Sequence, residues 1–339
     1  MKRLRLKNQY TCISACKGGI TLLRSPELRR SLFDDIQPGT DNSDENVAII
    51  GGLCDGRIAL FYESNARESS IVCETIASLD SSCAGIASDG VSTFCAVGVE
   101  GQLIEVVLKE RKTTWTKDNA TTTWETGERA TACCTKDSQI FVGFENAKLS
   151  QYTSSCPVAV WQSANKISVE KLVTRDRNTL IAAGMDGLLL FDIRENGKAS
   201  MRLPHSTGYS CVAVDKSMPN SIVAGTFEGM LVMYDLRKQI KTVSERRHDD
   251  MVCGIMFGET ISKPIYSYGR DGNVLGNDGV LLSISTPISG GATMNGRNEV
   301  FYFALENGTV SSYHREPTST ILRNRPALQL PKVEDIEYS

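Results

Sequence analysis

The sequence predicts an all-β fold: a β-propeller in which seven four-stranded antiparallel blades close into a ring. One short phrase recurs seven times along the chain. Its copies follow one another at steps of 36 to 46 residues, close to the spacing of four-stranded propeller blades. Around each turn the residues alternate between apolar and polar, as they do in half-buried strands.

Each copy of the phrase is a small apolar strand, a tight turn and an alternating strand that ends in an aromatic or aliphatic residue. An acid or asparagine followed by glycine tolerates the positive φ that a tight hairpin needs. The copies cover residues 47–62, 93–107, 139–152, 179–194, 221–237, 264–275 and 299–313. The second residues of the seven turns are Gly56, Gly101, Ala147, Gly187, Gly229, Gly272 and Gly308.

The fifth repeat shows a complete blade. Its four predicted strands, from the inner to the outer, cover residues 209–215, 221–227, 230–236 and 239–245. The outer strand is polar, as an edge near solvent should be. Because one blade cannot bury both its faces alone, seven blades around an axis are expected to cover one another.

We expect one propeller domain, residues 1–339, with three segments outside the blades. Residues 25–46 are polar and acidic, which favours a mobile loop, and the acidic tail from about residue 316 is expected to be disordered. Residues 109–129 are predicted as a second mobile loop. It contains Trp115 and Trp124, which are candidate partner-binding residues because tryptophan is enriched at binding anchors. The alternative is that both rings pack on the propeller wall.

The seventh repeat lacks an outer strand after Tyr313, and either end of the chain could supply it. Residues 3–7 alternate, with Leu4 and Leu6 on one face. The tail around residues 328–330 is the other candidate.

Two histidines are expected to make structural contacts of the repeat. His205 lies 23 residues before the turn acid Glu228, and His248 lies 23 residues before Asp271. Equal spacing in successive repeats predicts a repeated fold contact. The alternative is a general base or a metal ligand, which are roles that histidine also fills.

Composition and charge exclude several classes of function. The formal net charge of −3 provides no basic field for nucleic acid or anionic lipid, although four of the first seven residues are basic. No apolar run approaches the roughly 18 residues of a membrane span, and residues 1–10 lack the apolar core of a secretory signal. The eleven cysteines have no zinc-site spacing and fit free thiols of a cytosolic or nuclear protein.

No motif of a familiar enzyme class occurs: there is no nucleophile elbow, phosphate-binding loop, zinc-protease motif or dinucleotide fingerprint. The chain has only three histidines, and its carboxylates are concentrated at the repeat turns. We therefore expect no catalysis, no cofactor, no metal and no small-molecule substrate. Protein partners remain as the expected ligands.

The repeats resemble those of WD-repeat proteins over essentially the whole chain. Residues 186–238 and 263–275 are similar to the family of the forty-three-kilodalton nucleoporin. The shared features are two successive blades that end in aromatic-Asp-x-Arg, an acid-glycine turn before each, and a weaker last blade. Phe191 and Tyr234 stand where that family has tryptophan, the flanking loops are shorter, and the first three blades match only in number and turn placement.

This resemblance implies a non-catalytic scaffold in the Y-shaped outer-ring complex of the nuclear pore. Its partners would be α-solenoid nucleoporins, its location the nuclear envelope and otherwise the cytoplasm, and its role the support of pore assembly and nucleocytoplasmic transport. In WD repeats a histidine at these positions bonds to the turn acid, which implies the pairs His205–Glu228 and His248–Asp271.

A second resemblance leaves an alternative open. Asp192 with Arg194 and Asp235 with Arg237 end adjacent blades, 43 residues apart. Such double boxes resemble those of substrate receptors that dock on the propeller adaptor of a cullin-RING ubiquitin ligase. The four side chains, candidate partner-binding residues, would present planar charged forks on one rim. The other interpretation is an Asp–Arg pair that stabilises each blade end.

Overall fold

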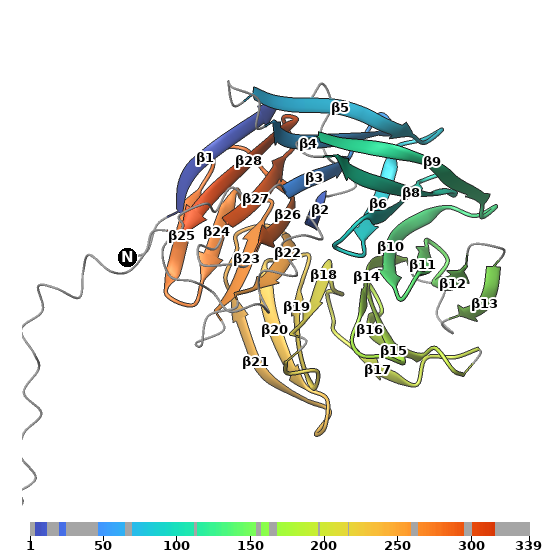
Figure 1. Cartoon of the computed structure of the whole chain (residues 1–339). Helices are drawn as coiled ribbons and strands as arrows, with labels where there is room; N and C mark the ends of the chain where they lie inside the picture. The colour runs from blue at the N-terminus through green and yellow to red at the C-terminus, as the bar shows by residue number, and fades with distance from the viewer. Residues whose placement is uncertain are drawn as a thin grey trace, which may run out of the picture.

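Seven four-stranded antiparallel sheets surround a common axis in the computed structural model of the chain (Figure 1). The predicted all-β fold of seven four-stranded blades is therefore confirmed. The structure describes residues 4–11, 20–24, 47–64, 70–111, 114–153, 157–162, 168–195, 197–215, 217–258, 264–294 and 300–315.

Six of the blades each use four consecutive strands, numbered from the inner to the outer. Blade one contains β2 (Ile20–Arg24), β3 (Val47–Gly52), β4 (Arg57–Ser64) and β5 (Ser70–Ser78). Blade two contains β6 (Cys83–Ser88), β7 (Thr93–Gly98), β8 (Gln102–Arg111) and β9 (Thr114–Glu125). Blade three contains β10 (Ala130–Lys136), β11 (Gln139–Phe144), β12 (Lys148–Tyr152) and β13 (Pro157–Gln162). Blade four contains β14 (Val169–Thr174), β15 (Thr179–Gly184), β16 (Gly187–Asp192) and β17 (Met201–Leu203).

The remaining strands complete the ring. Blade five contains β18 (Cys211–Val214), β19 (Ser221–Gly225), β20 (Met230–Asp235) and β21 (Ile240–Arg246), each within two residues of its predicted bounds. Blade six contains β22 (Val252–Phe257), β23 (Ile265–Gly269), β24 (Asn273–Gly276) and β25 (Gly279–Ser283). Blade seven contains β26 (Ile288–Met294), β27 (Val300–Leu305) and β28 (Thr309–Arg315), with β1 (Leu4–Thr11) as its outer strand.

The N-terminal strand closes the ring. β1 pairs antiparallel with β28, from Leu4 opposite Arg315 to Thr11 opposite Thr309. Of the two candidates for this position, the N-terminal segment is thus the one that occupies it. The tail around residues 328–330 lies outside the described residues, as does the whole segment from 316.

The seven predicted turns all use the left-handed backbone region. Their second residues have φ between +63° at Ala147 and +110° at Gly187. At Gly229 a Cβ would lie only 2.1 Å from the carbonyl oxygen of His248, so space as well as backbone geometry requires glycine there. The second residue of each predicted turn therefore marks a position where the hairpin requires a positive φ.

Ala147→Gly is expected to stabilise the protein by about 0.5–1 kcal/mol, because alanine pays a steric cost in the left-handed region that glycine avoids. Denaturant unfolding followed by circular dichroism would measure the gain. Ala183→Gly in strand β15 is the matched control and should destabilise the fold. A loss of stability in Ala147→Gly would contradict the left-handed backbone conformation assigned to this residue.

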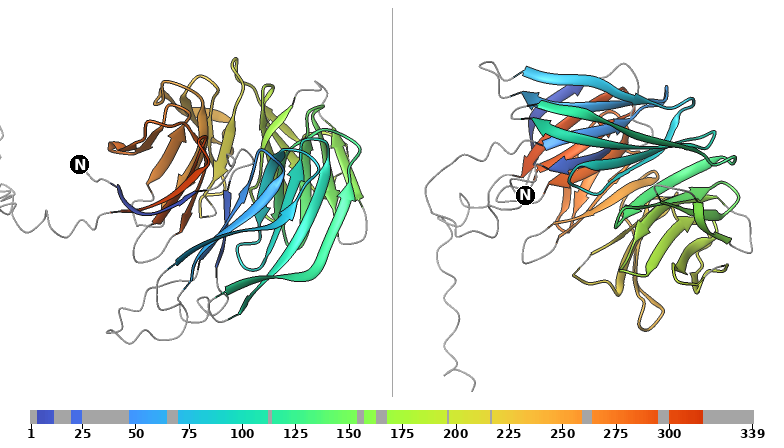
Figure 2. Two further views of the ribbon diagram at one scale, coloured as in Figure 1. Left: turned by 90° about the horizontal axis from the view of Figure 1, so that it is seen from above. Right: turned by 45° about the vertical axis from the view of Figure 1, so that its right-hand side comes forward.

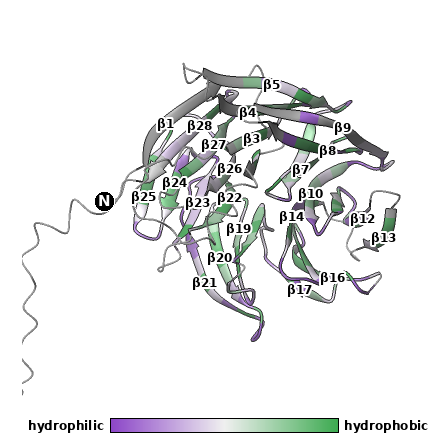
Figure 3. Ribbon diagram, in the orientation of Figure 1, coloured by the Kyte–Doolittle hydropathy of each residue, from purple (hydrophilic) through white to green (hydrophobic). Residues whose placement is uncertain are grey.

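Burial follows each strand's place in its blade. In β7, β11 and β15 every residue after the first is buried, because a second strand is covered on both faces by the neighbouring blades. In contrast, all seven residues of the outer strand β21 are exposed. Figure 3 shows the same contrast, with hydrophobic colour inside the ring and hydrophilic stretches along β21.

The prediction of a loop at residues 109–129 is wrong. Most of this segment belongs to the outer hairpin of blade two, where β9 pairs with β8 from Glu125 opposite Gln102 to Thr114 opposite Arg111. Threonine and tryptophan favour strands, and a polar outer strand is compatible with solvent on its free side. In Figure 2 the long outer strands of blades one and two lie side by side on the wall of the ring. Residues 25–46, the other predicted loop, lie outside the described residues.

Candidate functional site

The histidine of blade six lies in a buried network of hydrogen bonds. His248 Nδ1 is 3.1 Å from Asp271 Oδ1, and its Nε2 is 2.9 Å from the hydroxyl of Ser267. Asp271 also accepts the backbone N–H groups of Asp249 and Asn273 at 3.1 and 3.0 Å. The network joins the connection before β22 to the β23–β24 turn. It holds together the upper end of blade six, the end that carries the acid-glycine turns.

The pKa shifts in this network favour a neutral imidazole beside an ionised carboxylate. Burial lowers the pKa of His248, against the opposing effect of the Asp271 carboxylate. Burial opposes ionisation of Asp271, but bonds from the Asn273 amide and from His248 more than compensate and lower its pKa. The His248 Nδ1–H therefore donates to an ionised Asp271, and the imidazole Nε2 accepts the hydroxyl proton of Ser267.

These three side chains have the connectivity of a nucleophile, a base and an orienting acid. Ser267 is fully buried, however, and His248 is 1% exposed. A substrate would have no route to the hydroxyl without opening the blade. The arrangement is therefore suited to holding the fold together. Ser267 was not found by the sequence reasoning, although it lies at a fixed distance of four residues before the turn acid.

The predicted contact between His205 and Glu228 is wrong. Glu228 is exposed, and His205 Nδ1 instead lies 3.1 Å from the Thr207 hydroxyl, while its ring lies tilted against that of Tyr209, with the centroids 5.0 Å apart. Two substitutions between the repeats explain the difference. Blade six has Ser267 and Gly269, where a Cβ on Gly269 would lie 2.5 Å from the His248 ring. Blade five has Ala224 and Thr226 at the same distances from its turn acid. Ala224 offers no hydroxyl partner, and the Thr226 side chain takes the space that the imidazole would need.

The two Asp-x-Arg endings form ion pairs within their own blades. Arg194 Nη2 lies 2.6 Å from Asp192 Oδ2, and Arg237 Nη2 lies 2.8 Å from Asp235 Oδ2. Hydrogen bonds from the arginine side chain and backbone lower the pKa of Asp192 to about 2, and those from Arg237 lower that of Asp235. The pairs thus stay ionised across the physiological pH range. Asp55 and Arg57 make a third, similar pair that the sequence reasoning missed.

The two tryptophans of the blade-two hairpin have different places. Trp124, on β9, packs half-buried against the apolar cluster between blades two and three, with its ring centroid 6.2 Å from that of Tyr152. This is the wall-packing alternative to partner binding. The backbone of Trp115 lies in β9 opposite Glu110, and its side chain lies outside the described part.

Hydroxyl groups join neighbouring blades near the axis, a feature that sequence reasoning also missed. The Thr131 hydroxyl lies 3.1 Å from the Gly143 carbonyl of its own blade and 2.5 Å from the Val169 carbonyl of the next. Ser210 does the same between blades five and six, at 3.1 Å from Gly225 and 2.6 Å from Val252. Each hydroxyl thus connects two inner strands.

A carboxylate at the interface of blades two and three carries an unfavourable charge. Glu105 is half-buried on β8, and burial, followed by the nearby Asp89, raises its pKa. A raised folded-state pKa contributes stability below the unfolded value near 4.5, and this contribution is lost as the pH rises through the folded value.

Glu105→Gln is therefore expected to raise the melting temperature at pH 7 but not at pH 4. The gain should remain below about 1.4 kcal/mol, the equivalent of one pKa unit, because the side chain is partly solvated. Calorimetry at both pH values would measure it. An equal change at pH 4 and pH 7 would show that packing, and not charge, is responsible.

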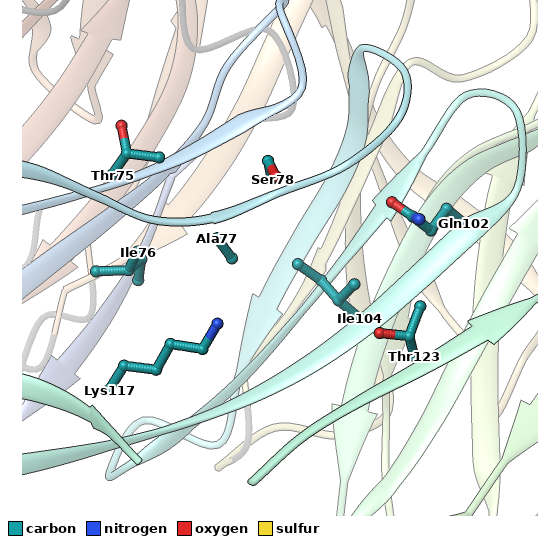
Figure 4. Close-up of a pocket in the computed structure, with 8 residues that line it drawn as sticks. All are labelled: Thr75, Ile76, Ala77, Ser78, Gln102, Ile104, Lys117 and Thr123. Carbon is teal, nitrogen blue, oxygen red and sulfur yellow. The ribbon is translucent and has the colours of Figure 1, made fainter. Parts of the chain in front are cut away.

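An open groove of about 330 Å³ lies on the wall between blades one and two (Figure 4). Its lining comes from β5, β8 and β9, and the Lys117 side chain extends between β5 and β8. The lining residues include no histidine, cysteine or carboxylate, so the groove offers no acid–base pair. Elsewhere in the described ranges, no group of three or more histidine, cysteine or acidic side chains is placed to hold a metal ion. The same ranges contain no helix that is long and apolar enough to cross a membrane.

Comparison with solved structures identifies the fold. The crystal structure of the WD40 beta propeller domain of Doa1 superposes with a TM-score of 0.68 at 14% sequence identity, covering 93% of this chain and 97% of that chain. No protein-family model matches the sequence, and no curated protein matches it. At this identity the likeness is one of fold, and the chain has the fold of a seven-bladed WD40 propeller.

Proposed function

We propose that this WD40 propeller is a non-catalytic scaffold subunit of the nuclear pore outer ring, where it supports pore assembly and nucleocytoplasmic transport. Blades four and five carry the proposal. Each has an acid-glycine turn and ends in an Asp-x-Arg pair, Asp192–Arg194 and Asp235–Arg237. These are the residues on which the resemblance to the nucleoporin family rests. A closed ring with faces and a wall suits a protein that stays docked on larger helical partners.

The test is a tagged chain expressed in cells, with imaging and affinity purification followed by mass spectrometry. We expect a punctate signal at the nuclear rim and co-purification of α-solenoid nucleoporins. A diffuse cytosolic signal with unrelated partners would contradict the proposal. The WD40 fold would stand in either case, because it rests on the structure alone.

A second candidate function is that of a substrate receptor for a cullin-RING ubiquitin ligase. The observation in its favour is that Arg194 and Arg237 are 66% and 69% exposed in adjacent blades. If this role is correct, the propeller adaptor of the ligase co-purifies with the wild-type chain and is lost from Arg194→Glu/Arg237→Glu. Absence of the adaptor from the wild-type preparation would exclude the role.

A further inference from the structure

The lower end of blades four and five has a basic surface, which we call the basic rim. It consists of the described turn residues 175–178, 193–195, 197–200, 215, 217–220 and 236–239, together with Ile240. Among the described residues of these turns, the exposed anions are Asp176 and Glu195. The exposed cations are Arg177, Arg194, Lys198, Arg237 and Lys238. Half-buried Asp192, Asp215 and Asp235 offset three of these cations, so the excess of positive charge is confined to the exposed layer, which is the layer that an acidic ligand would meet.

The two Asp-x-Arg pairs orient their guanidinium groups outward. Asp192 and Asp235 are only 19% and 16% exposed, whereas their arginines are 66% and 69% exposed. Each arginine donates to its aspartate through Nε and Nη2. The Nη1 hydrogens take no part in this pair and remain for an incoming acceptor. The aspartates therefore position two cations without covering them.

Two exposed apolar residues belong to the turns next to Arg237. Met218 and Ile240 are 46% and 47% exposed. The Leu236 N–H donates to the Asn220 carbonyl at 2.9 Å, which joins the turn that carries Met218 to the turn that carries Arg237. Ile240 pairs with Asp235 in the strand register. The turns that carry the charged groups thus also carry exposed apolar area.

Hydrogen bonds between the blades fix this surface. Arg175 of blade four donates through Nε to the Pro219 carbonyl at 2.7 Å and through Nη2 to Asn220 Oδ1 at 2.9 Å, both in blade five. The forks and the apolar pair are therefore held in one arrangement before any ligand arrives. Such preorganisation lowers the entropic cost of binding.

We infer that the basic rim docks an acidic segment of a protein partner, with carboxylates bound by Arg194 and Arg237 and an aliphatic side chain packed on Met218 and Ile240. Guanidinium groups match carboxylates in geometry and charge, and methionine is a frequent contact residue at binding surfaces. RNA is the less suitable ligand, because the described residues of the rim include no aromatic ring on which bases could stack. The inference rests on the proposed role as a protein-binding scaffold.

The test uses the purified full chain and a short fluorescein-labelled peptide in which leucines are spaced among glutamates. Fluorescence anisotropy should show binding that weakens with salt and is at least about tenfold weaker in Arg194→Gln/Arg237→Gln, a loss of about 1.4 kcal/mol. Met218→Ser/Ile240→Ser should also weaken it. Matched controls are Arg129→Gln/Arg270→Gln, which removes two exposed arginines at the upper end, and Val158→Ser/Val160→Ser, which removes two exposed valines in blade three. Melting temperatures verify that each variant is folded.

Three results would overturn the inference. One is a wild-type chain that does not bind the peptide. Another is a lack of selectivity: the rim variants bind the peptide as tightly as their controls do, or the wild-type chain binds a peptide with glutamines in place of the glutamates equally well. The last is a polyuridine oligonucleotide of the same length that binds the rim more tightly than the peptide. In cells, a rim variant that keeps its α-solenoid partners at the pore would support the proposed function and show that the rim is not needed for it. A wild-type chain that binds the peptide but never reaches the pore would contradict the proposed function and leave the inference about the rim supported.

Discussion

Gly229→Ala should destabilise the propeller by about 2–5 kcal/mol. The residue has φ +84°, where a side chain is strained, and its Cβ would lie 2.1 Å from the His248 carbonyl oxygen and 2.8 Å from that of Asp250. Both obstacles are backbone atoms, so no side-chain rotation relieves them. Urea unfolding at pH 7 would measure the loss.

Gly127 provides the control for this substitution. Its φ is +72°, but a Cβ there would meet nothing within 4 Å. Gly127→Ala should therefore cost only the backbone strain, about 1–2 kcal/mol. Equal losses in the two variants would show that the close approach of the His248 carbonyl contributes nothing.

His248→Ala should cost about 2–4 kcal/mol, because it leaves the buried Ser267 hydroxyl without its acceptor and removes one of the donors to Asp271. His205→Ala is the natural comparison, since its ring is half-exposed and, among the described residues, bonds to Thr207 in its own loop. We expect that variant to lose less than about 1 kcal/mol. Similar losses in both variants would contradict the distinction between the two histidines.

The same substitution has a pH dependence with a defined sign. The folded-state pKa of His248 is lowered from 6.5, so the unfolded chain binds the proton more readily as the pH falls. The stabilising contribution is complete above pH 6.5 and declines below it. The difference in melting temperature between the wild type and His248→Ala should therefore shrink from pH 7 to pH 5. A constant difference would mean that the imidazole does not titrate differently on folding.

The fold could be predicted from the sequence because each repeat contains the turn and strand residues that its own blade requires. Gly56, Gly101 and Gly187 are required by positive φ at the turns, and the apolar second strands are required by cover on both faces. These requirements are local and recur in every repeat. Ring closure depends on residues at opposite ends of the chain, and no local signal distinguished the two possible closing segments.

The candidate sites were predicted less completely, because they depend on contacts across strands. Equal spacing suggested that His205 and His248 would behave alike. The difference lies on the second strand, where Ala224 and Thr226 stand in place of Ser267 and Gly269. The polar composition of β9 suggested a loop, because the sequence does not show that β8 lies alongside to pair with it. The exposure of Met218 and Ile240 likewise emerges only from the assembled ring.

Closure of blade seven by β1 and β28 has a consequence for synthesis on the ribosome. β1 is synthesised before the other described strands, and its hydrogen-bonding partner β28 follows roughly 300 residues later. At typical elongation rates of about 5–20 residues per second, the wait lasts about 15–60 s. During that interval Leu4–Thr11 is a nascent segment with an unpaired backbone edge, which is the kind of segment that chaperones bind. The last blade to be completed therefore depends on a strand that is synthesised before all the other described strands.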